Sequence, residues 1–189
     1  MPIFFRGAGV GTYWHNNDAR VLGFTPKSPG VSPGASRMMQ HVARGSHTSP
    51  YLSFSRSFGI AWAYGVVGTS IATQQNPGYV YELDIPDPLP PGVTLLDPLQ
   101  EVAKTLGNPP GGSYQHDGQQ DFLLGVVDPL NHAARLTAAI RQPPGSSGTP
   151  RGATLTLELE TLVRTLRDAE VLALGNIPAA WVVYRHDVW

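Results

Sequence analysis

The sequence predicts an α+β fold. Hydrophobic residues make up 41% of the 189 residues, the level of a globular domain. Gly (21) and Pro (18) together form about a fifth of the chain, which indicates many turns and argues against a helical bundle. Short alternating segments typical of strands are interleaved with segments of helical spacing, and the strands dominate.

Three segments in the first half of the chain predict strands. Residues 3–5 are an apolar run that delivers Arg6 to a loop edge. Residues 49–55 alternate, so Ser53 shares one face with its polar neighbours while the apolar residues between them face the other way. Residues 78–85 predict a third strand, and residues 121–127 are a further candidate.

Helical spacing marks the segments between these strands. Residues 35–45 predict a helix closed by a glycine, and residues 57–68 predict a second helix with an apolar stripe. Short helical segments are expected at residues 97–106 and 132–141, and residues 154–168 are expected to form a helix or an extended segment. Loops are expected over residues 15–36, in the Pro- and Gly-rich stretch 86–112 and over 143–152.

The stretch "DAEVLALGNIPAAWVVYR", residues 168–185, predicts a strand, a turn and a second strand. The turn falls at Gly175-Asn176, and the second apolar run begins near Trp181. If the first strand begins at Asp168, then Asp168 and Glu170 lie on the same face, because strand residues two apart share a face. Two like charges side by side are expected to raise the pKa of one of them.

Composition excludes several classes of function. Charged residues are 14% of the chain and the net charge is −1, so no basic surface is expected to hold nucleic acid. The absence of cysteine excludes disulfides and thiolate chemistry, and the six histidines lack the spacing of metal ligands. No apolar run reaches the ~18 residues of a membrane span, and the first residues lack the pattern of a signal peptide. If the protein is exported, we expect a route without such a peptide.

Three distant stretches carry residues suited to one reaction. Arg6 supplies a planar, permanently charged fork that fits a phosphate. Ser53 supplies a hydroxyl that can orient a carboxylate, and Glu170 supplies a charge for a developing cation. The combination suits cleavage of a glycosidic bond through an oxocarbenium-like transition state.

The order Arg, Ser-x-Ser, acid-x-Glu resembles the ADP-ribosyltransferase toxins of the cholera toxin type, whose order is Arg, Ser-Thr-Ser, Glu-x-Glu. Beyond these motifs, "EVLALGNIP" (170–178) is similar to the strand and turn that carry the family's catalytic Glu. "HVARG" (41–45) and "GYVYELDI" (78–85) are similar to a helix and a strand of the same family. The resemblance covers most of the chain except an expected family-specific insertion near residues 86–153.

The resemblance implies a single catalytic domain over residues 1–189, with two small, mainly antiparallel sheets around an NAD cleft and flanking helices. It implies NAD as the substrate, no metal, and transfer of ADP-ribose to a protein acceptor. It also implies a toxin or effector that acts in the cytosol of a target cell, with a delivery, activator or immunity protein as a further partner.

The family's roles carry over position by position. Glu170 matches the catalytic Glu, Asp168 the acceptor-side acid, and Ser53 the residue that orients Glu170. The residues expected to bind NAD are Arg6, Gly7, His41, Ser53, Ser55 and Phe58, with Trp62 as an alternative aromatic near the nicotinamide.

Two departures from the family pattern bear on this interpretation. Phe54 replaces the central Thr, and it faces away from the two serines. Asp168 replaces the first Glu and is one methylene shorter, which leaves the acceptor open although arginine is favoured. Asp121 in "QQD" is a rival for the catalytic acid, while the acid pair in residues 82–84 and the "GAGVG" loop (7–11) are weaker alternatives.

Two other functions remain open at this stage. An NAD glycohydrolase would use water as the acceptor, and a catalytically inactive binding module would keep only the fold.

Overall fold

The computed structural model describes residues 3–45, 48–105 and 151–189. The chain divides into two compact units. Unit 1 comprises Met1–Ser32, His47–Leu96 and Arg167–Trp189, and unit 2 comprises Pro33–Ser46 and Asp97–Leu166. Most of the insertion expected near residues 86–153 lies outside the described residues, as do the strand and helix expected at 121–127 and 132–141.

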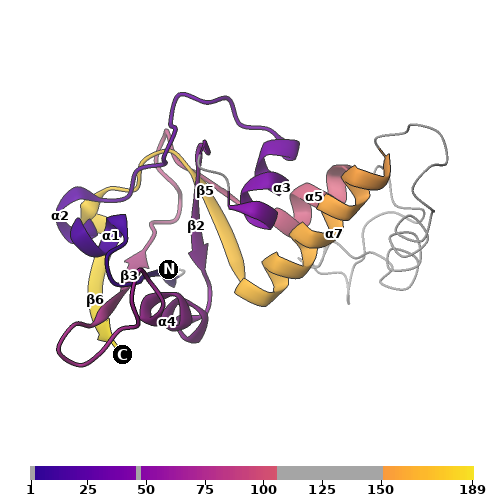
Figure 1. Cartoon of the computed structure of the whole chain (residues 1–189). Helices are drawn as coiled ribbons and strands as arrows, with labels where there is room; N and C mark the ends of the chain where they lie inside the picture. The colour runs from indigo at the N-terminus through magenta and orange to yellow at the C-terminus, as the bar shows by residue number, and fades with distance from the viewer. Residues whose placement is uncertain (1–2, 46–47, 106–150) are drawn as a thin grey trace, which may run out of the picture. The chain divides into compact units, whose positions relative to one another are not determined.

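Six antiparallel strands form the sheet of unit 1. They are β1 (Ile3–Ala8), β2 (Tyr51–Ser55), β3 (Gly78–Asp84), β4 (Thr94–Leu96), β5 (Glu170–Leu174) and β6 (Val182–Val188). Their order across the sheet is β4-β5-β2-β1-β3-β6. Figure 1 shows β2 and β5 side by side. The α+β class and the antiparallel pairing are confirmed.

The division into two small sheets is not confirmed, because the described strands pair into one continuous sheet. The pairing within that sheet is shortest between β1 and β2. Strand β1 pairs with β3 along its whole length, from Ile3↔Asp84 to Ala8↔Tyr79, but it pairs with β2 only at Phe5↔Ser55. The two halves of the sheet therefore meet at a single residue pair next to Arg6.

Helices of unit 1 include α1 (Tyr13–Asn16), α2 (Ala19–Leu22), α4 (Phe58–Val66) and the 3-10 turn η1 (Ala179–Trp181). Helices α1 and α2 fall in a stretch expected to be a loop. The carboxylate of Asp18 accepts a hydrogen bond of 2.9 Å from the backbone N–H of Arg20 and so begins α2. Strand β4 likewise lies in the Pro- and Gly-rich stretch that predicted no strand.

Unit 2 contains α3 (Ala35–Arg44) and α5 (Pro98–Thr105), both close to their expected positions. Helix α3 ends at Gly45, whose φ of 64° is left-handed and whose N–H bonds the carbonyl of His41. Helix α7 (Arg151–Asp168) runs through unit 2, and its last two residues belong to unit 1.

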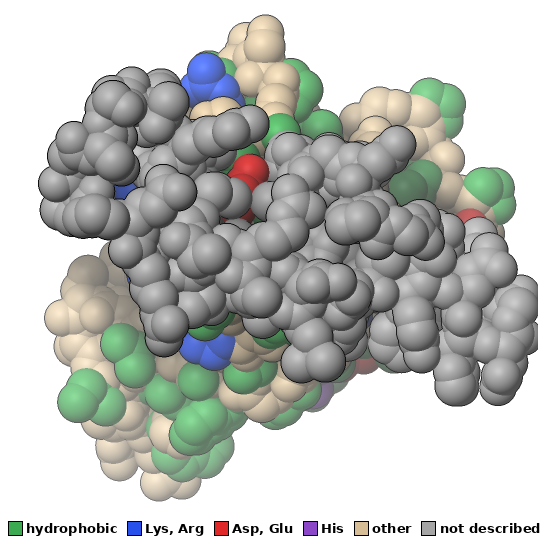
Figure 2. Space-filling view, turned by 90° about the vertical axis from the view of Figure 1, so that its right-hand side faces the viewer, with side chains coloured by type: hydrophobic (Ala, Val, Ile, Leu, Met, Phe, Trp, Pro, Cys, Tyr) green, Lys and Arg blue, Asp and Glu red, His purple; other side chains and the backbone are tan. Residues whose placement is uncertain are grey.

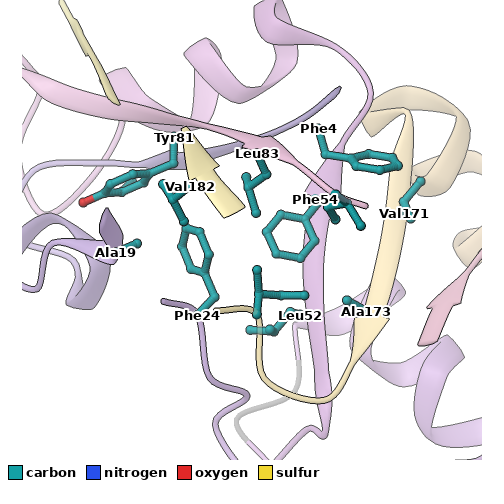
Figure 3. Packing of buried hydrophobic residues seen from close by; sticks show 13 residues of the cluster. Phe4, Ala19, Phe24, Leu52, Phe54, Tyr81, Leu83, Val171, Ala173 and Val182 are labelled. Carbon is teal, nitrogen blue, oxygen red and sulfur yellow. The ribbon is translucent and has the colours of Figure 1, made fainter. Parts of the chain in front are cut away.

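The core of unit 1 lies on one face of the sheet and is rich in aromatic rings. Phe24 packs edge-on against Phe54 and Tyr81, with ring centroids 5.5 Å apart in both pairs (Figure 3). Leu52 and Phe54 are buried in this cluster, as the alternation of residues 49–55 predicts. The serines of β2 consequently face the other side of the sheet.

Helix α4 lies on that other side, directly against the backbone of β1. A Cβ atom on Gly7 would come within 2.2 Å of the carbonyl oxygen of Ala61, so only glycine permits this approach. The missing side chain brings α4, and with it Tyr64, close to the strands that carry Arg6 and Ser53.

Charged side chains are sparse among the coloured atoms on the face in Figure 2, in keeping with the low charged fraction of the sequence. Within the described ranges, no helix is long and apolar enough to cross a membrane. The same part of the chain holds no group of three or more His, Asp or Glu side chains arranged to bind a metal ion.

Candidate active site

Glu170 is the first residue of β5 and is 7% exposed. Strand β5 pairs with β2 so that Ser55 lies opposite Glu170 and Ser53 lies opposite Leu172. Alternation then places Ser53 on the same face as Glu170, diagonally across the strand pair. The Ser53 hydroxyl donates a hydrogen bond to the Glu170 carboxylate.

The surroundings of Glu170 perturb its titration. Burial raises the pKa of Glu170 to about 7, while the hydrogen bond from Ser53 opposes the rise. The nearby charge of Asp168 raises the pKa further, and the positive charges of Arg6 and Arg167 lower it. Near neutral pH this carboxyl group is therefore close to the point where both its forms are populated.

Arg6 extends from β1 toward β2. Its Nη1 donates a hydrogen bond of 2.7 Å to the Ser53 carbonyl oxygen, and its guanidinium carbon lies 5.5 Å from the Phe24 ring centroid and 5.8 Å from that of Phe54. Burial lowers the pKa of Arg6 to about 10, and the charge of Glu170 acts in the opposite direction. Arg6 stays cationic at neutral pH.

The donors of Arg6 are largely unused within the described part of the chain. A guanidinium carries five N–H donors, yet the bond to Ser53 is the one that these residues supply. The Nε atom is buried with no hydrogen-bond partner there. A half-buried cation with spare donors near a buried carboxylate is an arrangement that a polar ligand can complete.

Strands β1, β2 and β5 thus bring Arg6, Ser53 and Glu170 together from three distant parts of the sequence. Arg6 and Glu170 are close enough for each charge to affect the pKa of the other. Arg6 contacts the Ser53 backbone, and the Ser53 side chain contacts Glu170.

Asp168 departs from the expected geometry, because it does not lie on the strand. It is the last residue of α7, and Ala169, with a φ of 46°, turns the chain between the helix and β5. The Ser55 hydroxyl donates a 2.6 Å hydrogen bond to the Asp168 carbonyl, and the Arg56 N–H donates one of 2.9 Å to the Ala169 carbonyl. The rule that strand residues two apart share a face does not apply across this turn.

The Asp168 carboxylate is instead held by two residues that the sequence analysis did not select. The Tyr64 hydroxyl donates to Oδ2 at 2.8 Å, and Arg167 donates from Nε to Oδ1 at 2.6 Å and from Nη2 to Oδ2 at 2.7 Å. Tyr64 stood in the predicted apolar stripe of α4, so its hydroxyl was not considered. Arg167 directly precedes Asp168, and this adjacency was the only sign in the sequence that Arg167 contacts the site.

Comparisons with known proteins leave this geometry as the main basis for a function. No protein-family model matches the chain, and no curated protein matches it. Among solved structures, the chain is similar to one titled "CARDS toxin, nicked", with a TM-score of 0.43 and 14% sequence identity. That match covers 96% of this chain and 24% of the toxin chain, so the chain spans a minor part of the toxin's length.

The other residues expected to bind NAD have different surroundings. Ser55 uses its hydroxyl to hold the turn before β5, and the same oxygen accepts a 3.0 Å bond from the Ser57 N–H. Gly7 is required for the packing of α4. Phe58 is 38% exposed, with its ring 5.5 Å from that of Phe5, and Trp62 on the same helix is 41% exposed.

The described part of the chain does not place the remaining candidate residues from the sequence analysis beside Arg6, Ser53 and Glu170. His41 belongs to α3 in unit 2, whereas the trio belongs to unit 1. Asp121 lies outside the described residues. Glu82 is hydrogen-bonded to His186 across β3 and β6, with 2.9 Å between the carboxylate and the ring nitrogen, so this acid already has a partner within the sheet.

Proposed function

We propose that this chain is a mono-ADP-ribosyltransferase that cleaves NAD and transfers ADP-ribose to a protein acceptor, with arginine favoured, as a toxin or effector. One observation carries the proposal. A buried carboxylate, Glu170, is hydrogen-bonded by the hydroxyl of Ser53 and lies near the half-buried cation Arg6. The resemblance to the cholera toxin type assigns roles to the same three residues.

Glu170 acts on the sugar that loses nicotinamide. As the bond between the ribose and nicotinamide breaks, positive charge develops on the ribose, and an ionised carboxylate beside it stabilises that charge. Burial strengthens this interaction because little water screens it. Ser53 fixes the orientation of the carboxylate and favours its ionised form.

Arg6 binds the phosphates of NAD. Its guanidinium can form charge-assisted hydrogen bonds to phosphate oxygens with the donors that the described residues leave unused. Packing against Phe24 and Phe54 holds the side chain in place before NAD arrives, which limits the entropy lost on binding. Phe58 or Trp62 supplies the aromatic surface for the nicotinamide.

Asp168 acts on the acceptor. A carboxylate that already forms a two-bonded contact with a guanidinium, that of Arg167, has the geometry to orient an acceptor arginine. The same contact favours the second candidate, an NAD glycohydrolase, because Arg167 occupies the position that an incoming arginine would take.

Two assays on the purified chain test the proposal. Release of nicotinamide from NAD measures cleavage and separates both enzymes from an inactive module. Transfer of biotin-labelled ADP-ribose to a cell lysate, followed by mass spectrometry of the labelled proteins, separates the transferase from the glycohydrolase and names the acceptor residue. We expect both signals, whereas an absence of nicotinamide release would refute the proposal.

A further inference from the structure

Tyr64 links two parts of the candidate active site that are far apart in sequence. At its base, a Cβ atom on Gly7 would come within 2.7 Å of the Tyr64 Cβ atom, so α4 carries Tyr64 directly over the β1 residue that follows Arg6. At its tip, the hydroxyl donates a 2.8 Å hydrogen bond to Oδ2 of Asp168, two residues before Glu170. The side chain therefore extends from the strand of Arg6 to the segment that leads into β5.

Asp168 is fixed to the region of α4 at both its main chain and its side chain. The Ser55 hydroxyl donates a 2.6 Å bond to the Asp168 carbonyl and accepts a 3.0 Å bond from the N–H of Ser57, the residue before α4. Tyr64, on the same helix, holds the carboxylate. These contacts hold Asp168 in place without any contribution from Arg167.

Arg167 is the other partner of the Asp168 carboxylate. Its Nε donates to Oδ1 at 2.6 Å, and its Nη2 donates to Oδ2 at 2.7 Å and to the Tyr64 hydroxyl at 3.0 Å. The Arg167 side chain is 54% exposed, whereas that of Asp168 is 16% exposed. An ion pair with an exposed partner contributes little stability, because water and salt compete with it. An incoming guanidinium can therefore replace Arg167 at a small cost.

We propose that Tyr64 is a positioning residue of the transfer reaction, which keeps the Asp168 carboxylate directed at the acceptor after the acceptor has displaced Arg167. The proposal rests on the proposed function, since it takes Asp168 as the acid that receives the acceptor. When Arg167 leaves, Oδ1 is released for the acceptor, while Oδ2 keeps its bond to the Tyr64 hydroxyl. The packing of α4 on β1 at Gly7 holds that hydroxyl in place.

Tyr64 orients the reaction without exchanging a proton. Burial raises the pKa of Tyr64, and its bond to Asp168 raises that pKa further, so the hydroxyl remains a donor at neutral pH. In the transfer step, an acceptor nitrogen forms a bond to C1′ of the nicotinamide ribose as the bond from C1′ to nicotinamide breaks. Nicotinamide leaves as a neutral molecule with the electron pair of that bond. The proton of the attacking nitrogen passes to Asp168 and then to solvent.

The experiment measures nicotinamide release and transfer of ADP-ribose to agmatine, a small guanidinium compound, by the purified full chain. Tyr64→Phe removes the hydroxyl and keeps the ring. We expect kcat/KM for agmatine to fall about tenfold, the effect of losing one hydrogen bond to a charged group, while nicotinamide release without agmatine stays within about twofold of wild type. Tyr13→Phe, on α1 and 62% exposed, is the matched control and should change neither activity.

A second variant should change the reaction with agmatine in the opposite direction. Arg167→Gln removes the side chain that competes with the acceptor for Oδ1 of Asp168, while Tyr64 still holds Oδ2. The KM for agmatine should therefore fall. A network that only stabilises the fold would make both variants poorer enzymes. A raised KM for agmatine in both Tyr64→Phe and Arg167→Gln would overturn the inference.

The outcomes separate this inference from the proposed function. Equal transfer to agmatine by Tyr64→Phe and wild type overturns the inference and leaves the proposed function intact. Nicotinamide release without any transfer to agmatine also overturns it, because Asp168 then receives no guanidinium, and leaves NAD cleavage in place. No nicotinamide release at all overturns the proposed function and the inference with it. Unchanged circular dichroism of Tyr64→Phe shows that reduced transfer does not come from misfolding.

Discussion

Glu170 and Asp168 are two residues apart in sequence, yet the fold gives their carboxylates opposite surroundings. Glu170 starts a central strand, is 7% exposed and is bonded by the uncharged hydroxyl of Ser53. Asp168 ends a helix, and its partly buried side chain is bonded by the cation Arg167 and the Tyr64 hydroxyl. The left-handed turn at Ala169 separates the two environments.

The difference shows how one short segment can supply two different acids. Environment sets the task of a carboxylate more than its identity does. The main cause of the raised pKa of Glu170 is its burial, and the nearby charge of Asp168 makes a smaller contribution.

Removing the Asp168 carboxylate gives the largest contrast between the two acids. We expect Asp168→Ala to lower transfer to a protein acceptor by about 10²-fold or more, the typical contribution of acid–base catalysis, while NAD hydrolysis falls much less. Water needs less orientation than an arginine side chain. Parallel assays of label transfer and nicotinamide release measure the two activities.

Asp187→Ala is the matched control, since Asp187 is a half-exposed acid on β6 at the far end of the sheet from β5. It should leave both activities close to wild type. An equal loss of transfer and hydrolysis in Asp168→Ala would mean that Asp168 acts on NAD itself.

Stability provides a second contrast. The folded-state pKa of Glu170, about 7, lies above its ordinary value of 4.5, so between these values the folded state binds a proton that the unfolded state does not. Stability conferred by this group is present at low pH and is lost as pH rises through about 7. At pH 8.5 the free energy of unfolding of Glu170→Gln should thus exceed that of wild type by at most about 3 kcal/mol. The variant should therefore unfold at a higher urea concentration.

This advantage of Glu170→Gln should shrink toward pH 5, where the wild-type carboxyl is protonated in the folded state. Urea titrations at both pH values measure it. A Glu170→Gln variant that is less stable than wild type at pH 8.5 would show that burial of the ionised Glu170 carboxylate does not destabilise the folded state.

Substitution of Arg6 by lysine tests the role proposed for this cation in NAD binding. Lysine keeps the charge but loses the planar fork, and one charge-assisted bond is worth roughly 1.5–3 kcal/mol, so NAD affinity should fall about tenfold or more. Calorimetric titration of NAD in a Glu170→Gln background measures binding without turnover. Arg20→Lys, an exposed arginine paired with Asp18, is the control. If Arg6→Lys and Arg20→Lys bind NAD with equal affinity, Arg6 does not contact NAD.

The smallest expected effect concerns the hydroxyl that orients Glu170. Ser53→Ala removes a hydrogen bond that favours the ionised carboxylate, so the pKa of Glu170 rises further. The acidic limb of the pH profile of nicotinamide release should move to higher pH, with a few-fold loss of rate at pH 7. Ser53→Thr keeps a hydroxyl and should restore the limb. A profile that Ser53→Ala leaves unchanged would separate Ser53 from Glu170.

The strand positions of Arg6, Ser53 and Glu170 could be predicted because each residue lies in or beside a short segment with clear strand character. Alternation placed the serines of β2 opposite the core residues Leu52 and Phe54, and the pairing of β2 with β5 agrees. Sequence alone does not determine strand register, so it could not predict that Ser55 and Glu170 are paired across β2 and β5. The degree of burial, which raises the pKa of Glu170, depends on the same register.

Asp168 was assigned to the wrong element for a specific reason. The helix that precedes it continues to Asp168, and the chain then turns at Ala169, a residue type that rarely takes a positive φ. No glycine or asparagine marks the turn. The partners Tyr64 and Arg167 were missed because they are brought together by the packing of α4 on β1, which depends on Gly7 and is not visible as a local pattern.

The central claim is that Glu170 stabilises the transition state of NAD cleavage from a buried position. The most direct measurement is the rate of nicotinamide release by wild-type protein and by Glu170→Gln, compared at equal NAD saturation. Loss of one well-placed electrostatic stabiliser predicts a fall of about 10²–10³-fold in kcat with unchanged circular dichroism. A Glu170→Gln variant that keeps more than about a tenth of the wild-type rate would contradict the account and direct attention to Asp121.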